Sequence, residues 1–290
     1  MNKKIIVLLS GMVICAGALA VVGKKTYVVS KDINQNIGRQ QQKTAGLRIE
    51  DSPQEELVNK VISKMSSRAQ SAIKINNIDE FLTGLDKVLA CNATDTENDI
   101  PLLKLVDKKH PLSQGYEPKN LLTLIKNNDL ALSRENLSLR FEAYNALQIL
   151  AKAARKDGIK LLISSTYRSY SYQKKVYEKW VKIDGQEEAD RESARPGTSQ
   201  HQLGTAVDFG SISDDFATTP MGKWMYKHAA EYGWSLSFPE GYEDVTGYRW
   251  ECWHFRYIGK EACQFQKKYF SNIQQFMLEF LDEWQKMNAD

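Results

Sequence analysis

The sequence predicts an α+β fold in which helices flank a small, mainly antiparallel sheet. Helical and strand-like segments are mixed along the chain, and the strands are too short and too irregular in order for a repeating βαβ unit. The composition is that of a globular domain, because 42 % of the 290 residues are hydrophobic, 26 % are charged and six are tryptophan. A chain of this size and composition can bury a large core, which argues against an intrinsically disordered protein.

Residues 1–23 are predicted to be an export signal or a membrane anchor. Lys3 and Lys4 precede an uncharged apolar run that ends in small residues. The tripeptides AGA (16–18) and ALA (18–20) fit the A-x-A pattern of signal cleavage, yet the run is also close to the length that spans a bilayer of about 30 Å. Cleavage and retention both stay open. In either case we expect an exported protein of the cell envelope or periplasm that meets the membrane only through this segment.

The next two segments differ in their apolar pattern. Residues 24–52 are polar with little apolar periodicity and are predicted to be a linker. Residues 53–100 are predicted to be a helical stalk, because apolar residues recur there at helical spacing between Leu57 and Met65 and again between Ile78 and Leu89. We expect two short helices in this stalk, before the main domain.

The main domain is predicted over residues 101–270, followed by a terminal amphipathic helix over 271–290. Apolar residues spaced three and four apart from Leu139 predict a helix that ends at Gly158. A β-branched and apolar run from Ile159 predicts a buried strand. Later segments predict, in order, a helix at about 171–183, a strand in GTAVDFG (204–210), a helix in TPMGKWMYKHAAEYG (219–233) and a strand in WECWHFRYIG (250–259).

The charge balance bears on the partners of the protein. The formal net charge is +3, and loss of the two signal lysines would leave about +1. Proteins that bind nucleic acid carry a strong basic field, which this chain lacks. We therefore expect no nucleic-acid partner.

Three cysteines lie beyond the predicted signal. Cys91, Cys252 and Cys263 would face an oxidising compartment after export. Three cysteines would allow one disulfide and one free thiol, and the sequence does not show which two cysteines would pair.

A cluster of metal-ligand residue types lies in the second half of the chain. Only four histidines occur in the sequence, and His201 precedes Asp208 by seven residues. A turn at Gly204 followed by a strand would return the chain so that both side chains meet. Taken alone, such a pair is more often a hydrogen-bonded loop pair than a metal site. The segment ECWH changes this balance, because His254 offers a third ligand and Glu251 lies three residues before it.

Two imidazoles and one carboxylate suit a zinc ion with an open fourth position. The fold prediction therefore includes a single zinc site. Zinc lowers the pKa of bound water to about 7, and Glu251 could take a proton from that water and later deliver it to a leaving amine. His110 and His228 lack carboxylate or thiolate partners at metal spacing and are expected to be structural or surface residues. Cys252 could replace a ligand as a thiolate, but we expect it to pack or pair.

The pattern resembles a known family, the VanY-type D-alanyl-D-alanine carboxypeptidases and related L,D-carboxypeptidases. These are zinc enzymes of the structural group that includes lysostaphin and the sonic hedgehog domain. Their signature is S-x-H-x-x-G-x-A-x-D followed by E-x-x-H, and the residues here that match it are Ser199, His201, Gly204, Ala206, Asp208, Glu251 and His254. The resemblance covers about residues 103–267 and excludes the stalk and the last helix.

The resemblance implies a role for each matching residue. It implies that zinc is bound by His201, Asp208 and His254 and that Glu251 is the general base and acid. It also implies that Arg168, with Gln173 and Ser199, holds the terminal carboxylate of the substrate. Independently of the resemblance, a guanidinium matches a carboxylate in geometry, and Arg168 follows a predicted strand, although a surface arginine is the alternative.

We therefore expect an exported zinc carboxypeptidase that removes the C-terminal D-alanine from peptidoglycan stem peptides. Three alternatives stay open: an L,D-carboxypeptidase that acts on tetrapeptide stems, an endopeptidase that cuts within wall peptides, and a non-catalytic module that binds the wall. Arg168, as a reader of a free carboxylate, argues against an endopeptidase. Glu251 argues against a binding module, which needs no base. The sequence leaves open the oligomeric state and the roles of the stalk and the last helix.

Overall fold

The structure is a computed structural model that describes residues 21–22, 25–26, 52–92 and 100–288. The chain divides into two compact units, Met1–Leu57 and Val58–Asp290. The predicted signal or anchor and the predicted linker lie almost wholly outside the described residues, and they stay predictions. No helix in the described part of the chain is long and apolar enough to cross a membrane.

Few residues of the smaller unit are described. Its two-residue strands β1 (Val21–Val22) and β2 (Lys25–Thr26) pair in antiparallel fashion. The helix α1 (Pro53–Lys64) begins in this unit and continues into the larger one. The fold that positions the candidate site belongs to the larger unit.

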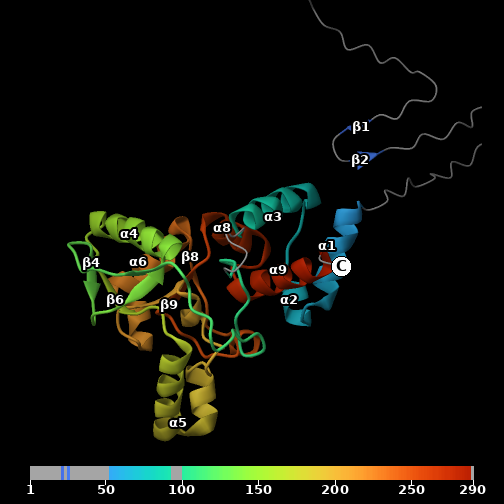
Figure 1. Ribbon diagram of the computed structural model, residues 1–290. Coiled ribbons are helices and arrows are strands. Elements are labelled where there is room, and N and C mark those ends of the chain that lie inside the picture. Colours follow the sequence, from blue (N-terminus) through green and yellow to red (C-terminus); the bar gives the residue numbers. More distant parts are fainter. Residues whose placement is uncertain (1–20, 23–24, 27–51, 93–99, 289–290) are drawn as a thin grey trace, which may run out of the picture. The chain divides into compact units, whose positions relative to one another are not determined.

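A five-stranded sheet with the order β4-β6-β7-β9-β8 forms the centre of the larger unit (Figure 1). The first pair, β4 with β6, is parallel, whereas the other three pairs are antiparallel, so the expected α+β class with a mainly antiparallel sheet is confirmed. A separate two-stranded sheet pairs β3 with β5. The strand bounds are β3 Leu121–Thr123, β4 Leu130–Leu132, β5 Ser138–Arg140, β6 Leu161–Ser165, β7 Ala206–Phe209, β8 Trp234–Leu236 and β9 His254–Tyr257.

The central strand β7 separates a hydrophobic core from a polar face. Side chains alternate across a strand, so Val207 and Phe209 point to one face while Asp208 points to the other. Val207 and Phe209 belong to the main core, which also contains Ile163 of β6 and Phe255 of β9. The polar face of the same strands is therefore free to carry chemistry.

The helix α4 (Phe141–Lys156) packs on the core side of the sheet. Its apolar residues recur at helical spacing, and Leu147 and Leu150 are fully buried in the main core. The chain leaves α4 through Gly158, which has a φ of 79°, and then enters β6. The predicted order of helix, glycine and buried strand is confirmed.

The helix predicted at 171–183 is longer and broken. It corresponds to α5 (Tyr170–Glu192), whose backbone leaves helical geometry at Gly185 with a φ of 82°. Glycine accepts this conformation without a steric cost, so the chain reverses and a second helical segment follows. Tyr177 of the first segment hydrogen bonds to Asp190 of the second at 2.7 Å, and Figure 1 shows the two segments side by side.

The helices between α5 and β9 are short. The helix predicted at 219–233 is α6 (Pro220–His228), continued by a 3₁₀ turn. The other bounds are α7 Glu243–Thr246 and the 3₁₀ helices η1 Gln200–Leu203, η2 Asp214–Thr218 and η3 Ala229–Tyr232.

Helices from the two ends of the larger unit share an aromatic cluster. The rings of Phe81, Phe265 and Phe280 meet there, with ring centroids of 5.0 Å and 5.5 Å from Phe81 to the other two. The helices that supply or flank them are α2 (Ser67–Ala72), α3 (Ile78–Asn92), α8 (Lys260–Tyr269) and α9 (Gln274–Asn288). The region predicted as a stalk thus contains α1, α2 and α3 rather than two helices, and α3 packs with the C-terminal helices (Figure 1).

The three cysteines that the structure describes are free thiols. Cys91 is exposed, whereas Cys252 and Cys263 are buried. Cys252 belongs to the main core, and its Sγ lies 3.5 Å from the carbonyl oxygen of Ser213. No disulfide joins these cysteines, and Cys252 packs in the core as expected.

Candidate active site

Two strands and one 3₁₀ turn bring the predicted ligands together. Asp208 of β7 is paired in register with His254 of β9, so their side chains lie on the same face of the sheet. His201 lies on η1, whose start is capped by Ser199: the Oγ atom accepts a hydrogen bond from the His201 N–H at 3.3 Å. The turn ends at Gly204, which has a φ of 70°, and the chain then enters β7. The predicted turn at Gly204 is confirmed.

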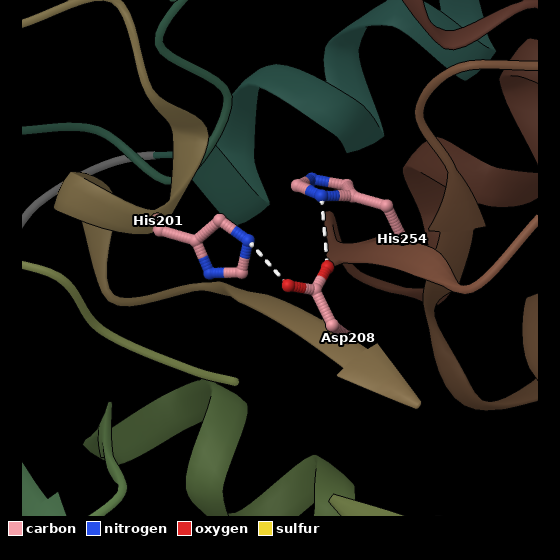
Figure 2. Close-up of side chains that lie close together, drawn as sticks. All are labelled: His201, Asp208 and His254. Atoms are coloured by element: carbon pink, nitrogen blue, oxygen red, sulfur yellow. Dashed lines mark ion pairs between the residues drawn. The ribbon is translucent and has the colours of Figure 1, made fainter. Parts of the chain in front are cut away.

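The three side chains converge on one point (Figure 2). His201 Nε2 lies 3.2 Å from Asp208 Oδ2, and His254 Nδ1 lies 3.1 Å from Asp208 Oδ1. One potential ligand atom from each residue lies within 4.8 Å of the others. All three residues are buried, with exposed fractions of 1 %, 4 % and 3 % for His201, Asp208 and His254.

The outer nitrogen of each imidazole has an acceptor of its own. His201 Nδ1 lies 2.7 Å from the carbonyl oxygen of Thr166, and His254 Nε2 lies 3.3 Å from Gln200 Oε1. In a neutral imidazole one nitrogen donates and the other accepts. These acceptors favour a proton on the outer nitrogens, and with a metal in the site they would leave the lone pairs of His201 Nε2 and His254 Nδ1 free to bind it. Histidines that bind metals have this arrangement.

The donor set fits a metal ion such as zinc. His201 Nε2 and Asp208 Oδ1 are buried and have no hydrogen-bond partner among the described residues, which is costly for polar atoms away from water. Two imidazole nitrogens and a carboxylate with a fourth position open are a common zinc ligand set. In the part of the chain that the structure describes, no other group of three such residues could hold a metal.

The protonation states favour metal binding. Burial lowers the pKa of His201 to about 4, and the nearby Arg168 guanidinium acts in the same direction. Burial would raise the pKa of Asp208, but His201 and His254 outweigh it and hold this pKa well below its usual range. At neutral pH His201 is then a neutral donor and Asp208 an anion, which are the forms that bind metal.

Glu251 lies beside this triad. Its Oε2 is 3.4 Å from His254 Nδ1, and the residue is only 9 % exposed. Burial, with the charge of Asp208 as the next cause, raises the pKa of Glu251 well above its usual value. A carboxyl group with a raised pKa can accept and return a proton near neutral pH, as general acid–base chemistry requires.

A cavity of about 300 Å³ opens in front of these residues. Its walls come from β6 and the loop after it, from α5, from η1 and from the loop before β9. The candidate residues that line it are Arg168, Ser199, His201, Asp208, Glu251 and His254.

Arg168 brings a positive charge to this cavity and forms no ion pair with the residues that the structure describes. Among the described residues no carboxylate lies within ion-pair distance of its guanidinium, and its buried Nε has no hydrogen-bond partner. Burial lowers its pKa, and the negative charges of Asp208 and Glu251 partly offset that effect. The backbone N–H of Arg168 donates to the backbone carbonyl oxygen of His201 at 3.2 Å, so the position of Arg168 is tied to that of His201. This guanidinium is available to an anionic ligand.

Comparison with known proteins shows which family the chain resembles. Residues 136–260 match the family VanY, D-alanyl-D-alanine carboxypeptidase. The chain is 33 % identical over 208 residues to the putative carboxypeptidase YodJ of Bacillus subtilis (strain 168), across 70 % of this chain and 75 % of that protein. The chain belongs to the VanY family. It is accordingly a peptide hydrolase of the carboxypeptidase class.

The VanY-family chain has two further similarities, to proteins whose names state a carboxypeptidase activity. It is 30 % identical over 163 residues to a D-alanyl-D-alanine carboxypeptidase of Enterococcus faecium, across 54 % of this chain and 51 % of that protein. The chain thus spans about half the length of this relative. It is also similar to the solved structure of the LdcB LD-carboxypeptidase, with a TM-score of 0.56, 30 % identity, and coverage of 66 % of this chain and 92 % of that one.

Gln173 is the one predicted site residue that does not line the cavity. It is 1 % exposed, and its Nε2 donates to the carbonyl oxygen of Ala194 at 2.7 Å. Ala194 does line the cavity, so Gln173 supports the wall from behind. The other six predicted residues share the cavity surface.

The expectation for the two remaining histidines was wrong in one respect. Each has a carboxylate partner three residues away, with His110 Nδ1 at 2.8 Å from Asp107 and His228 Nδ1 at 3.3 Å from Glu231. Neither pair gains a third ligand among the described residues, so neither is a candidate metal site.

Sequence reasoning missed several residues of this VanY site. Gln200 contacts His254, and Tyr248 and Arg249 line the cavity. Gln200 lies between two signature residues, Ser199 and His201, and this position was a usable signal. Tyr248 and Arg249 precede Glu251 closely, but nothing in their residue types distinguishes a cavity wall from a buried loop.

Proposed function

We propose that this VanY-family enzyme is a zinc-dependent carboxypeptidase that removes the C-terminal D-alanine from peptidoglycan stem peptides. The observation that carries the proposal is the location of Arg168, whose guanidinium forms no ion pair among the described residues and shares one cavity with Glu251 and the His201, Asp208 and His254 triad. A charge of this kind selects a substrate with a free terminal carboxylate. Similarity to the D-alanyl-D-alanine carboxypeptidase of Enterococcus faecium supports the choice of peptide.

In this mechanism His201, Asp208 and His254 hold the zinc ion, and Arg168 holds the terminal carboxylate of the peptide. When bound, zinc supplies Lewis acidity and makes a water nucleophile available near neutral pH. Glu251 takes a proton from the attacking water and delivers it to the amine nitrogen of the departing D-alanine as the C–N bond breaks. Ser199 and Arg168 orient the peptide, so that the scissile carbonyl faces Glu251.

A second candidate is an L,D-carboxypeptidase that acts on tetrapeptide stems. Similarity to the LdcB LD-carboxypeptidase favours it. Both candidates require a free terminal carboxylate, so Arg168 has the same role in each. They differ in the stereochemistry of the residue on the other side of the scissile bond.

The proposal includes the cellular location. The apolar run after Lys3 and Lys4 supports export, and stem peptides of the wall lie outside the cytoplasm. Fractionation of cells that express the chain, followed by immunodetection, tests this location. Detection in the cytoplasm alone would contradict it.

Digestion of synthetic stem peptides by the full chain tests the activity. A pentapeptide, a tetrapeptide and a pentapeptide amidated at its C-terminus are incubated with the protein, with and without a chelator, and products are identified by mass spectrometry. We expect loss of one alanine from the pentapeptide, its arrest by the chelator, its return with zinc, and no cleavage of the amide. Preference for the tetrapeptide would select the L,D alternative. Undiminished cleavage of the amide would indicate an endopeptidase, and zinc binding without cleavage of any peptide would indicate a binding module.

A further inference from the structure

The two histidines of the triad are held in different ways. The outer nitrogen of His201 contacts a backbone carbonyl, that of Thr166, at 2.7 Å. The outer nitrogen of His254 contacts a side chain, Gln200 Oε1, at 3.3 Å. A backbone acceptor is present whatever residue occupies the position, whereas a side-chain acceptor depends on the residue and on what holds it.

Gln200 is held by a second buried side chain. Ser237 Oγ lies 2.7 Å from Gln200 Oε1 and 3.3 Å from Gln274 Oε1. A hydroxyl carries one proton, which the two oxygens share in a three-centre hydrogen bond, with the shorter contact to Gln200 the stronger. Gln274 belongs to α9, and its Nε2 donates to the Ser235 carbonyl oxygen at 3.3 Å. The exposed fractions of Gln200, Ser237 and Gln274 are 4 %, 2 % and 1 %.

These contacts form a continuous polar path from the triad to the C-terminal helix. The path runs from His254 at the start of β9 through Gln200 of η1 and Ser237 after β8 to Gln274 of α9. Every member is buried, where a polar group without a partner is costly and a satisfied one has a restricted orientation. The Phe238 ring packs against the His254 ring at a centroid distance of 4.7 Å and limits its movement further.

We propose that Gln200 is a positioning residue for His254, held in place by Ser237 and Gln274, so that α9 helps to set the geometry of the metal site. The Gln200 side-chain oxygen accepts a proton from His254 Nε2, which favours the tautomer whose Nδ1 lone pair would bind the metal. Without this acceptor the imidazole loses the preference for that tautomer, and its ring loses an anchor. The metal part of this inference rests on the proposed function, because it takes His254 as a zinc ligand.

Zinc affinity of the full chain tests the proposal. Partners of metal-binding histidines typically contribute about 10- to 100-fold to metal affinity. We expect Gln200→Leu to weaken zinc binding by about this factor, measured by competition with a chromophoric chelator. Gln200→Glu retains an oxygen acceptor and should restore most of the affinity. Ser237→Ala should weaken binding by less, because Gln200 stays present but loses its hydroxyl donor.

Gln202 offers a matched control. It lies on the same 3₁₀ turn, is 0 % exposed, and its Nε2 donates to the carbonyl oxygens of Ser113 and Tyr116 at 3.0 Å and 3.1 Å rather than to the site. Gln202→Leu therefore removes an equally buried amide without touching His254. We expect it to lower thermal stability while leaving the zinc Kd unchanged. Equal losses of affinity in Gln202→Leu and Gln200→Leu would overturn the proposal, because they would show a general structural effect.

The tautomer of His254 provides a readout that needs no zinc. The chain has four histidines, so ¹⁵N NMR of the imidazoles can be assigned by single substitutions. In the metal-free protein Asp208 Oδ1, 3.1 Å from His254 Nδ1, competes with Gln200 for the ring proton, so we expect a mixture of tautomers whose Nε2–H fraction is lower in Gln200→Leu. An unchanged tautomer together with an unchanged zinc Kd would overturn the positioning role. If the parent chain bound no zinc, the proposed function would fail, and the tautomer measurement would still decide whether Gln200 orients His254.

Discussion

The two walls of the cavity differ in how their charges are satisfied. On the wall that carries His201, Asp208 and His254, the charged and polar atoms face one another at 3.1 Å and 3.2 Å, and the outer nitrogens have acceptors. On the wall formed by the loop after β6, Arg168 has no carboxylate within ion-pair distance among the described residues. The first wall is organised before any ligand arrives, and the second retains a charge that a ligand can neutralise.

The local structure explains this difference. Asp208 and His254 are set by the register of β7 and β9, so their separation follows from strand pairing. Arg168 lies on the loop that follows β6, and Glu251 lies on the loop that precedes β9. Loops supported by a rigid sheet are the common location of residues that act on a ligand, and strands hold sites with greater precision.

Glu251→Gln should give the largest effect, because it removes the proposed base and leaves the three metal ligands in place. The amide cannot accept the proton of the attacking water, so we expect kcat to fall by about 10²- to 10⁴-fold with the zinc Kd retained. Peptide hydrolysis and a chelator competition assay measure the two quantities. Glu192→Gln is the matched control, because Glu192 lines the same cavity but pairs with Arg249 at 3.4 Å. Full activity of Glu251→Gln would refute the assigned base.

Arg168→Leu should give the next largest effect and tests the open charge directly. Loss of a charged partner for a carboxylate costs about 2–4 kcal/mol, or roughly 30- to 1000-fold in kcat/KM. Stem pentapeptide hydrolysis measures it. Arg249→Leu is the control, since Arg249 lines the cavity but pairs with Asp214 at 2.7 Å. If both variants lost activity equally, Arg168 would not be the specific reader of the carboxylate.

Gln173→Leu should have a smaller effect, and its nature decides between two roles. If Gln173 supports the wall, the variant leaves the Ala194 carbonyl without its donor and costs about 1–3 kcal/mol of stability. The melting temperature then falls and kcat/KM changes little. If Gln173 instead contacts the substrate, as the family resemblance implies, kcat/KM falls while the melting temperature stays constant.

The smallest expected effect is a pH-dependent change in the stability of the metal-free protein. The pKa of Glu251 is raised in the folded state, so between its unfolded value, near 4.5, and that raised value the folded state binds more protons. The contribution of Glu251 to stability is therefore complete below about pH 4.5 and decreases as pH rises. Glu251→Gln is neutral throughout, so its melting temperature relative to the parent should be higher at pH 7 than at pH 4. Thermal denaturation in chelator at both pH values measures this. An equal difference at both would contradict the raised pKa.

Much of the candidate site follows from local sequence. The spacing of His201, Gly204 and Asp208 requires one turn followed by one strand, and the structure contains both. The helix that ends before Gly158 and the strand after it are also local, because amphipathic spacing and a glycine stop define them. Such features depend on residues a few positions apart, so a single sequence is enough to predict them.

Other features depend on packing between distant segments. The break at Gly185 places a second helical segment beside the first, and the spacing of apolar residues in the sequence does not predict this reversal. The three cysteines have the residue type for a disulfide, but the fold buries Cys252 and Cys263 as free thiols and leaves Cys91 exposed. Gln173 matches the family pattern in sequence, yet its amide turns to Ala194.

The sequence by itself determined the residue types of the candidate site, their order and the turn that joins His201 to Asp208. Only the tertiary structure decided which atoms meet: the register that sets His254 opposite Asp208, the lack of an ion-pair partner for Arg168 among the described residues, and the path from Gln200 through Ser237 to α9. The physical reason is that residue types and turns are local properties of the chain. Pairing, burial and the satisfaction of a charge depend on segments brought together by folding.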